Sequence, residues 1–301
     1  MRIDPETDGA RGALLGTFVG DALGMPFEGA APAEVPEPLE MVNARLGRGT
    51  YTDDTQMMIA LAESLIEHGR VEEEHLARAF QDAYDPDRGY GGGTRRVLEL
   101  WASGMPVADA AGQLFDGQGS RGNGAAMRIA PVAVRYAGEP SRLCAEADRS
   151  ARVTHAHPVG VDAAVVQAAA IGAALRGEDA LEVARSAGRT EEMRDGLRDV
   201  GELLPATPEP AEVAARLGSS SDARRSVPAA VYAAVAHATF EQAVGYAVRV
   251  GGDTDTVAAM AGAIVGARDG AQCIPARWLE ALEDGERGRS HVQRLAVRLI
   301  G

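Results

Sequence analysis

Apolar residues recur at helical spacing along most of this chain of 301 residues. In TQMMIALAESLIEH they share one stripe, Met58, Leu61, Ala62 and Leu65, and EEEHLARAFQDAY repeats the pattern. Alanine-rich runs compatible with helices follow at 158–176, 178–187, 190–204, 227–238, 240–250, 254–268 and 287–300. Alternating β-branched residues bounded by turn pairs are nearly absent. The pattern therefore predicts an all-α protein, a multi-helix orthogonal bundle.

Segments of turn composition interrupt the helical pattern. They fall at 26–50, 85–93, 116–124, 204–209 and 218–226. None is a Pro/Ser-rich linker, which favours a single domain over residues 1–301. Glycine also recurs at every fourth position, at Gly12, Gly16, Gly20 and Gly24. On a helix these residues would form a flat stripe that another backbone could approach closely.

Composition and charge narrow the class of protein. The chain is 46% apolar and 25% charged, which fits a globular protein with a large core. Its net charge of -14 is the wrong sign for a broad basic face, so we expect neither nucleic acid nor an anionic membrane as a partner. No apolar run approaches membrane-spanning length and the first residues do not resemble a signal peptide, so we expect a cytoplasmic protein, and a monomer. Cys144 and Cys273 lie in no metal-ligand spacing and are expected to be buried free thiols.

Two short acidic motifs each stand just ahead of a predicted helix. They contribute Thr52, Asp53 and Asp54 from YTDDTQMM, and Asp253, Asp255 and Thr256 from VGGDTDTVAA. Asp and Thr are favoured helix N-caps, so capping alone explains either motif. If the bundle brought both helix starts together, four carboxylates would repel one another unless cations were present. Oxygen ligands without His or Cys favour Mg or Mn, or Ca, over Zn, and the pair of motifs predicts a binuclear metal cleft.

Two glycine-rich segments also precede helices, GQGSRGNGAAMRIAPVAV at 117–134 and RGYGGGT at 88–94. Backbone N–H groups near the positive end of a helix dipole commonly bind phosphate. Neither segment matches the P-loop or the dinucleotide fingerprint, so a flexible connector is the alternative.

The paired histidines His155 and His157 precede Pro158, an expected first helical position. They either contact a ligand or belong to a surface loop. Glu28 follows Pro26 in a loop, where it would ordinarily be solvated. The sequence has no GxSxG elbow and no recognisable Cys/His pairing, so a covalent Ser or Cys mechanism lacks support.

Taken in order, several segments resemble the ADP-ribosylglycohydrolase family, relatives of the hydrolase that reactivates dinitrogenase reductase. They are GALLGTFVGDALGMPFEG, YTDDTQMM, RGYGGGT, GNGAAMRIAPVA, THAHPVGVDAA, SVPAAVYA and GGDTDTVAAMAGAIVGA, and they extend from about residue 11 to 268. The resemblance implies an all-α fold with two Mg or Mn ions in a cleft. It also implies cleavage of the N- or O-glycosidic bond that joins ADP-ribose to a protein side chain or another acceptor.

The resemblance also implies roles for individual residues. Metal ligands would be Thr52, Asp53, Asp54, Asp253, Asp255 and Thr256. The ADP-ribose loop would be Gln118, Gly119, Ser120, Arg121, Gly122, Asn123 and Gly124, with His155 also contacting the substrate. The N–H groups of Gly119, Ser120, Gly122 and Asn123 are expected to hold the diphosphate. Glu28 falls where some members have a mobile glutamate that closes over the metals, and Asp54 or Asp253 is the candidate for proton transfer.

The choice of substrate stays open at this point. Arg121 stands where some relatives carry an aromatic residue near the nucleotide, so Tyr90, Trp101 and Phe115 become candidates for adenine stacking. Arginine-linked ADP-ribose is favoured, with serine-linked and free small ADP-ribosyl compounds as further substrates. The rival hypotheses are another metal-dependent hydrolase on the same scaffold and a non-catalytic ADP-ribose binder or structural protein.

Overall fold

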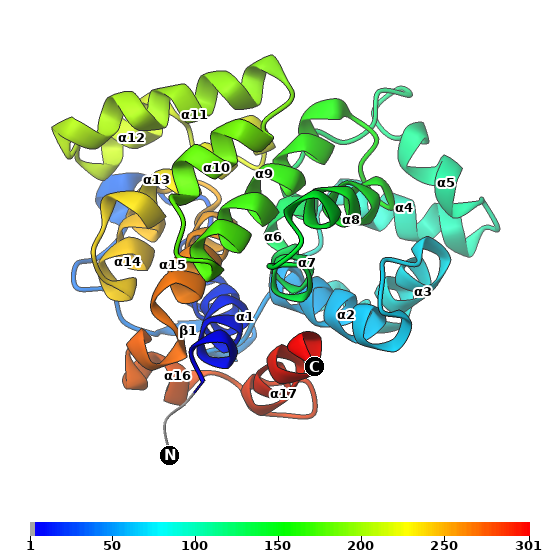
Figure 1. Ribbon diagram of the computed structural model, residues 1–301, viewed down its shortest axis with the longest axis horizontal. Coiled ribbons are helices and arrows are strands. Elements are labelled where there is room, and N and C mark those ends of the chain that lie inside the picture. Colours follow the sequence, from blue (N-terminus) through cyan, green and yellow to red (C-terminus); the bar gives the residue numbers. More distant parts are fainter. Residues whose placement is uncertain (1–3) are drawn as a thin grey trace.

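The computed structural model describes residues 4–301, which fold almost entirely into helices (Figure 1). The α-helices are α1 (Pro5–Gly24), α2 (Asp53–His68), α3 (Glu73–Ala83), α4 (Gly92–Ala102), α5 (Val107–Ala110), α6 (Gly124–Met127), α7 (Ala130–Arg135), α8 (Pro140–Arg152), α9 (Pro158–Leu175), α10 (Ala180–Ala187), α11 (Glu191–Leu203), α12 (Pro210–Arg216), α13 (Ala223–Ala236), α14 (Phe240–Arg249), α15 (Thr254–Asp269), α16 (Ala276–Ala281) and α17 (Arg289–Ile300). Short 3-10 turns are η1 (Met25–Phe27), η2 (Pro32–Glu34), η3 (Pro86–Arg88), η4 (Ala111–Gln113), η5 (Leu204–Ala206) and η6 (Ala271–Cys273). Strands β1 (Asn43–Ala44) and β2 (Gly47–Arg48) form one small antiparallel pair. The predicted all-α class is confirmed.

The helices that the alanine-rich runs predict are present, with one boundary that differs by several residues. The run at 227–238 corresponds to α13, which already begins at Ala223, inside the segment expected to be a loop. The Asp222 carboxylate accepts a hydrogen bond from the N–H of Arg224 and so caps the helix before the apolar run starts. Pro228 then lies inside α13, and a methyl group added at Gly196 of α11 would lie 2.6 Å from its ring.

The glycine stripe of α1 lies directly against α15. Figure 1 shows the two helices side by side, and they pack together along their length. A methyl group added at Gly12 or Gly16 would overlap the carbonyl oxygen of Gly266 or Gly262, and the reverse holds for both residues of α15. The backbones therefore touch, as the spacing of the α1 glycines predicts. This contact fixes the position of the first residues of α15 relative to the last turn of α1.

Helix α9 is apolar on all sides and lies in the core. It is long and apolar enough to cross a membrane by length and composition, so the expectation that no run approaches that length is wrong. However, 89% of that helix is buried inside the protein, packed against α8, α10 and α15. A helix that is hydrophobic all round is also what the centre of a large helical protein requires.

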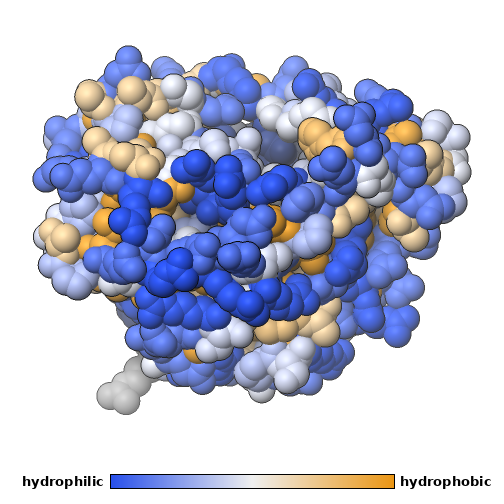
Figure 2. Space-filling view, turned by 90° about the horizontal axis from the view of Figure 1, so that it is seen from above, coloured by the Kyte–Doolittle hydropathy of each residue, from blue (hydrophilic) through white to orange (hydrophobic). Residues whose placement is uncertain are grey.

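Hydrophilic residues dominate the face shown in Figure 2, where hydrophobic ones are scattered.

The two cysteines are free thiols, but neither is buried as expected. Cys144 is half-buried on α8, and Cys273 is exposed because it ends η6, a surface turn that follows α15.

The α1–α15 contact gives a direct stability prediction. In Gly16→Ala the new methyl group would overlap the Gly262 carbonyl, so we expect the free energy of unfolding to fall by about 1–3 kcal/mol or more. The control is Gly245→Ala in α14, where an added methyl group has no neighbour within 4 Å among the described residues. That control should gain about 0.5–1 kcal/mol from helix propensity. Urea denaturation measures both, and equal effects of the two variants would contradict close backbone packing.

Candidate functional site

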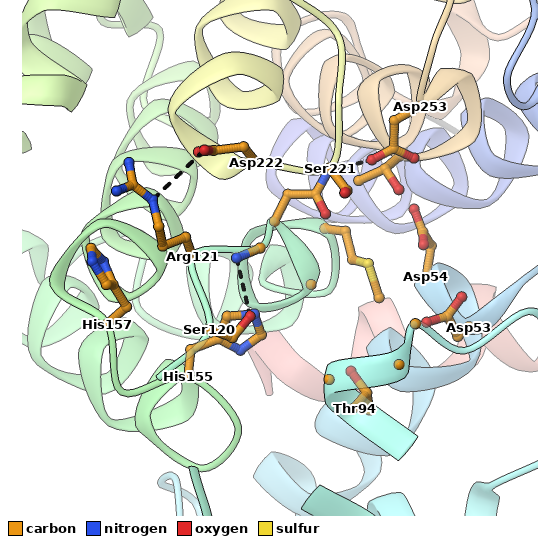
Figure 3. Close-up of a pocket in the computed structure, with 18 of the residues that line it drawn as sticks. Asp53, Asp54, Thr94, Ser120, Arg121, His155, His157, Ser221, Asp222 and Asp253 are labelled. Atoms are coloured by element: carbon orange, nitrogen blue, oxygen red, sulfur yellow. Dashed lines mark hydrogen bonds and ion pairs between the residues drawn. The ribbon is translucent and has the colours of Figure 1, made fainter. Parts of the chain in front are cut away.

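A pocket of about 570 Å³ collects residues from parts of the chain that are far apart in sequence (Figure 3). Its walls are Glu28 after α1, the starts of α2, α4 and α15, the loop at 115–124, and the histidines before α9. The acidic residues Asp53, Asp54, Asp253 and Asp255 all line it, as does Thr256. The two acidic motifs, about 200 positions apart in sequence, therefore meet in one cavity. Thr52 is buried behind it, and its hydroxyl caps α2.

The start of α15 is formed by a tight glycine turn. Gly252 has a positive φ of 72°, and an added methyl group there would overlap the Ser219 carbonyl. Its N–H donates to the carbonyl of Ala30 and its own carbonyl accepts from Gly29, which ties this turn to the segment after Glu28. Gly251 also has a positive φ of 79°, and an added methyl group there would lie 2.7 Å from the Ala30 carbonyl oxygen, so the backbone needs both glycines of GGDTDT.

Asp253 occupies the N-cap position of α15 but, among the described residues, its side chain makes no capping hydrogen bond. Its carboxylate instead accepts a 2.7 Å hydrogen bond from the side-chain amide of Asn123. Asn123 also donates to the Ser226 hydroxyl, so both of its amide hydrogens are used inside the protein. Capping alone does not explain this motif, because the side chain that should cap the helix faces the pocket instead (Figure 3).

The start of α2 is held by a residue that sequence reasoning missed, Asp21 of α1. Its fully buried carboxylate accepts from the N–H groups of Thr52 and Thr55 and, at 2.6 Å, from the Thr55 hydroxyl. These donors belong to the first turn of α2, where N–H groups lack partners within the helix. The sequence signal was a single Asp inside an apolar, glycine-striped helix, since a buried Asp is rare unless it is paired.

Burial and mutual repulsion disfavour charge on the pocket carboxylates. Desolvation, then the charges of Asp21, Asp253 and Glu28, raises the pKa of Asp53 to about 7. Desolvation and Asp255 raise the pKa of Asp54 well above its usual range, and Asp255 shifts in the same direction. The Asp54 Oδ2 atom is buried and has no hydrogen-bond partner within residues 4–301. An unpartnered anionic oxygen in such a place is unfavourable unless a cation or a proton neutralises it.

The N–H groups of the glycine loop form hydrogen bonds within the protein, which corrects the expectation that they bind a diphosphate. Gly119 N–H donates to Leu114 O, Gly122 N–H to the Ser120 hydroxyl, and Asn123 N–H to Ser221 O. Three of the four N–H groups expected to hold a diphosphate are thus already bonded within the protein. The loop is a rigid wall of the pocket, and anion donors have to come from other groups.

The first turn of α4 offers such groups. Gly91, Gly92, Gly93 and Thr94 line the same pocket at the start of an 11-residue helix. The N–H groups of a first turn have no partner within their own helix and lie at its positive end. Arg121 also lines the pocket, and its guanidinium lies 3.7 Å from Asp222 and 3.8 Å from Glu192, longer than normal hydrogen bonds.

His155 lies buried beneath the glycine loop, and a hydrogen-bond relay fixes its tautomer. The Arg128 guanidinium, fully buried, donates to Thr154 Oγ1 at 2.8 Å, and Thr154 Oγ1 lies 2.8 Å from His155 Nδ1. Arginine cannot accept, so among the described residues His155 Nδ1 is the acceptor left for the hydrogen of the Thr154 hydroxyl. Burial, with the positive charge of Arg128, lowers the pKa of His155 to about 3. The neutral ring therefore carries its proton on Nε2, which faces Gly122 and Gly124.

Comparison with known proteins identifies the family. A family model described as ADP-ribosylglycohydrolase matches residues 2–301. The chain belongs to the ADP-ribosylglycohydrolase family. It is 33% identical to the ADP-ribosylhydrolase ARH3 of Homo sapiens, over 92% of this chain and 89% of the relative. It is also 29% identical to the ADP-ribosylarginine hydrolase Tri1 of Pseudomonas putida, over 97% of this chain and 78% of the relative.

A solved structure of an ADP-ribosylglycohydrolase-related protein complex superposes with a TM-score of 0.82 at 33% identity. The alignment covers 99% of this chain and 98% of that one. This ADP-ribosylglycohydrolase is therefore a hydrolase with the family fold, as its motifs predicted. The family acts on ADP-ribosylated substrates.

Of the remaining residues that the sequence suggested for this ADP-ribosylglycohydrolase, some line the pocket and others belong to the core. The two histidines separate, because His157 is partly exposed and caps α9 by accepting from Val159 N–H, while His155 is buried. Of the aromatic candidates, Tyr90 and Trp101 belong to the core. Phe115 is 60% exposed, lines the pocket and has a positive φ of 50°. Arg128 and Thr154 lie within two of the segments that carry the family resemblance, GNGAAMRIAPVA and THAHPVGVDAA, but sequence reasoning gave neither a role.

The carboxylate cluster predicts an unusual pH dependence in the absence of divalent cations. The folded protein raises the pKa of Asp21 to about 6 and of Asp53 to about 7, from ordinary values of 3.8. Between about pH 4 and 7 the unfolded chain releases protons that the folded chain keeps, so the free energy of unfolding should fall as pH rises. Urea denaturation with a chelator measures it, and Asp53→Asn should flatten the slope. A wild-type slope identical to that of Asp53→Asn would contradict the shifted pKa.

The relay predicts the protonation of His155. Nitrogen NMR of the wild type should show the proton on Nε2 from pH 5 to 8. Thr154→Val removes the donor to Nδ1 and should mix the two tautomers, whereas Thr154→Ser should preserve the wild-type spectrum. Losing this hydrogen bond should also destabilise the fold by about 1–3 kcal/mol. A His155 ring that titrates near pH 6.5 in the wild type would contradict the relay.

Proposed function

We propose that this protein is a metal-dependent hydrolase that cleaves the glycosidic bond between ADP-ribose and a protein side chain and releases ADP-ribose. The observation that carries the proposal is the gathering of Asp53, Asp54, Asp253 and Asp255 in one pocket, with Asp54 Oδ2 lacking a partner among residues 4–301. A purely structural protein has no use for such a destabilising cluster.

The pocket residues fit two Mg or Mn ions. Four carboxylates would balance two divalent cations, and the Thr256 hydroxyl adds a hard oxygen on the same wall. The proposed ligands are Asp53, Asp54, Asp253, Asp255 and Thr256, together with Thr52, the buried N-cap residue of α2. When bound, such ions orient sugar hydroxyls, stabilise developing charge and lower the pKa of a water molecule.

The chain's own residues prepare the proton transfer. Asn123 holds the Asp253 carboxylate in one orientation, and the buried position of Asp54 raises its pKa. A carboxylate held beside the reacting bond is suited to accept a proton from water or to give one to a leaving group. We assign this role to Asp54 or Asp253. Glu28, exposed at the edge of the same pocket, is proposed to close over it.

The ADP part is proposed to lie along the pocket residues outside the two acidic motifs. Phe115 presents the exposed aromatic face for the adenine, in a backbone conformation that is unfavourable for its residue type. The first turn of α4 and the Arg121 guanidinium supply the donors for the diphosphate. The loop from Gln118 to Gly124 contributes a fixed surface, which His155 supports from below.

The proposal also specifies the group to which ADP-ribose is linked in the substrate. We expect arginine-linked ADP-ribose, because Glu28 at the rim is exposed and can pair with a guanidinium leaving group. The relative named as an ADP-ribosylarginine hydrolase supports this choice. Serine-linked and free small ADP-ribosyl compounds are the competing substrates, and a non-catalytic ADP-ribose binder is the competing class.

The test is release of free ADP-ribose from arginine-linked and serine-linked peptides, in Mg, in Mn and in a chelator. We expect metal-dependent release that Asp253→Asn lowers by at least about a hundredfold, since it removes a proposed ligand and proton carrier. The control is Asp82→Asn, which makes the same change at an exposed carboxylate of α3 outside the pocket and should keep full activity. Binding of ADP-ribose without release from either peptide, with the fold intact, would reject the protein-linked substrates and favour free small ADP-ribosyl compounds.

A further inference from the structure

A second possible metal site lies far from the pocket, where α2 ends and α3 begins. Glu67 and His68 are the last two residues of α2, and His75 lies in the first turn of α3. One ligand atom from each of the three lies within 4.8 Å of the others. Among residues 4–301, these are the His, Cys, Asp or Glu side chains gathered most tightly in this way. The proposed catalytic function makes no use of them.

We propose that Glu67, His68 and His75 bind a zinc-type divalent cation. His75 Nε2 lies 3.3 Å from one Glu67 carboxylate oxygen, and His68 Nε2 lies 4.0 Å from the other. A tetrahedral zinc ion with ligand bonds of 2.0–2.2 Å separates its ligand atoms by about 3.3–3.6 Å. The His75–Glu67 pair already has this spacing, and the His68 ring, 35% exposed, would have to approach the Glu67 carboxylate from its present 4.0 Å.

A buried hydroxyl already orients one of the imidazoles. Ser64 Oγ, one turn earlier on α2 and almost fully buried, lies 2.9 Å from His75 Nδ1. Metal-binding histidines usually donate from their second ring nitrogen to such a partner, which leaves the other nitrogen free to bind the ion. With Nδ1 donating to Ser64, the Nε2 lone pair of His75 points to the Glu67 side.

The donor set distinguishes this site from the pocket. Two imidazoles and one carboxylate suit zinc and its neighbours in the transition series, whereas Mg prefers oxygen ligands throughout. All three side chains are accessible, with His75 21%, His68 35% and Glu67 66% exposed. Water would complete the coordination sphere.

The bound ion would link the end of α2 to the start of α3. Gly69 ends α2 in a left-handed conformation, and the chain turns directly into α3 through Gly69–Glu72. A metal bound to both sides of this turn would restrain it. The proposed catalytic carboxylates lie at the opposite end of α2, about 22 Å away at 1.5 Å per residue. The bound ion should therefore stabilise the fold without taking part in hydrolysis.

The experiment is a calorimetric titration of zinc chloride into the tag-free full chain, kept saturated with Mg. We expect one zinc per chain, weakened at least about tenfold by His75→Gln or His68→Gln, with Ser64→Ala weakening it about tenfold through the second ring nitrogen. The matched control is His291→Gln. His291 also pairs with a carboxylate, that of Glu63, but within the described residues it does not belong to a group of three metal-ligand side chains. It should bind zinc as the wild type does.

A thermal melt provides the second readout. Zinc should raise the melting temperature of the wild type and of His291→Gln but not of His68→Gln, whose ring makes no hydrogen bond within residues 4–301 and can be removed without unfolding the chain. Equal zinc affinity in all variants, or no zinc binding by the Mg-saturated wild type, would overturn the proposal. Neither measurement depends on hydrolysis, so the zinc site is tested separately from the proposed function.

Discussion

The direct backbone contact between α1 and α15 is the constraint on which the site depends. Glycines on both helices remove the side chains that would separate them, at a cost in helix propensity of up to about 1 kcal/mol for each glycine. In return, the last turn of α1 lies against the first turn of α15, where the Thr254 hydroxyl donates to Gly24 O at 2.7 Å. Asp21 on α1 then holds the first turn of α2. One packed seam thus determines where both acidic motifs stand.

The same arrangement opposes stability within the pocket. Asp53, Asp54 and Asp255 are brought into a desolvated space, which raises the pKa of each, and the nearby charges of Asp21 and Asp253 raise it further. Asp21 differs from them, because its oxygens are satisfied by donors from Thr52 and Thr55. It stabilises the position of α2 rather than offering a free oxygen. The fold therefore separates the carboxylate that organises the site from those that remain available to a cation.

Much of the fold could be predicted from sequence because it rests on local patterns. Helical periodicity predicted the long helices, and the repeat of glycine at every fourth position predicted a close backbone approach before its partner was known. The meeting of the two acidic motifs followed from their composition and the family resemblance. Asp21, Arg128 and Thr154 could not be chosen this way, since their roles arise from contacts between distant segments. The boundary of α13 differed for a local reason, the Asp222 cap ahead of an apolar run.

The hydrogen bonds of the glycine loop bear on how an acidic protein could hold an anionic ligand. A flexible loop would have to lose conformational entropy before its N–H groups could bind phosphate. Here Gly119, Gly122 and Asn123 have already used theirs to fix the loop against Leu114, Ser120 and Ser221. That leaves the loop preorganised in shape but poor in donors. The positive end of α4 and the Arg121 side chain lie on the same pocket, and in the proposed binding mode they would supply the donors that the loop lacks. In this arrangement, shape and charge complementarity come from different elements of the fold.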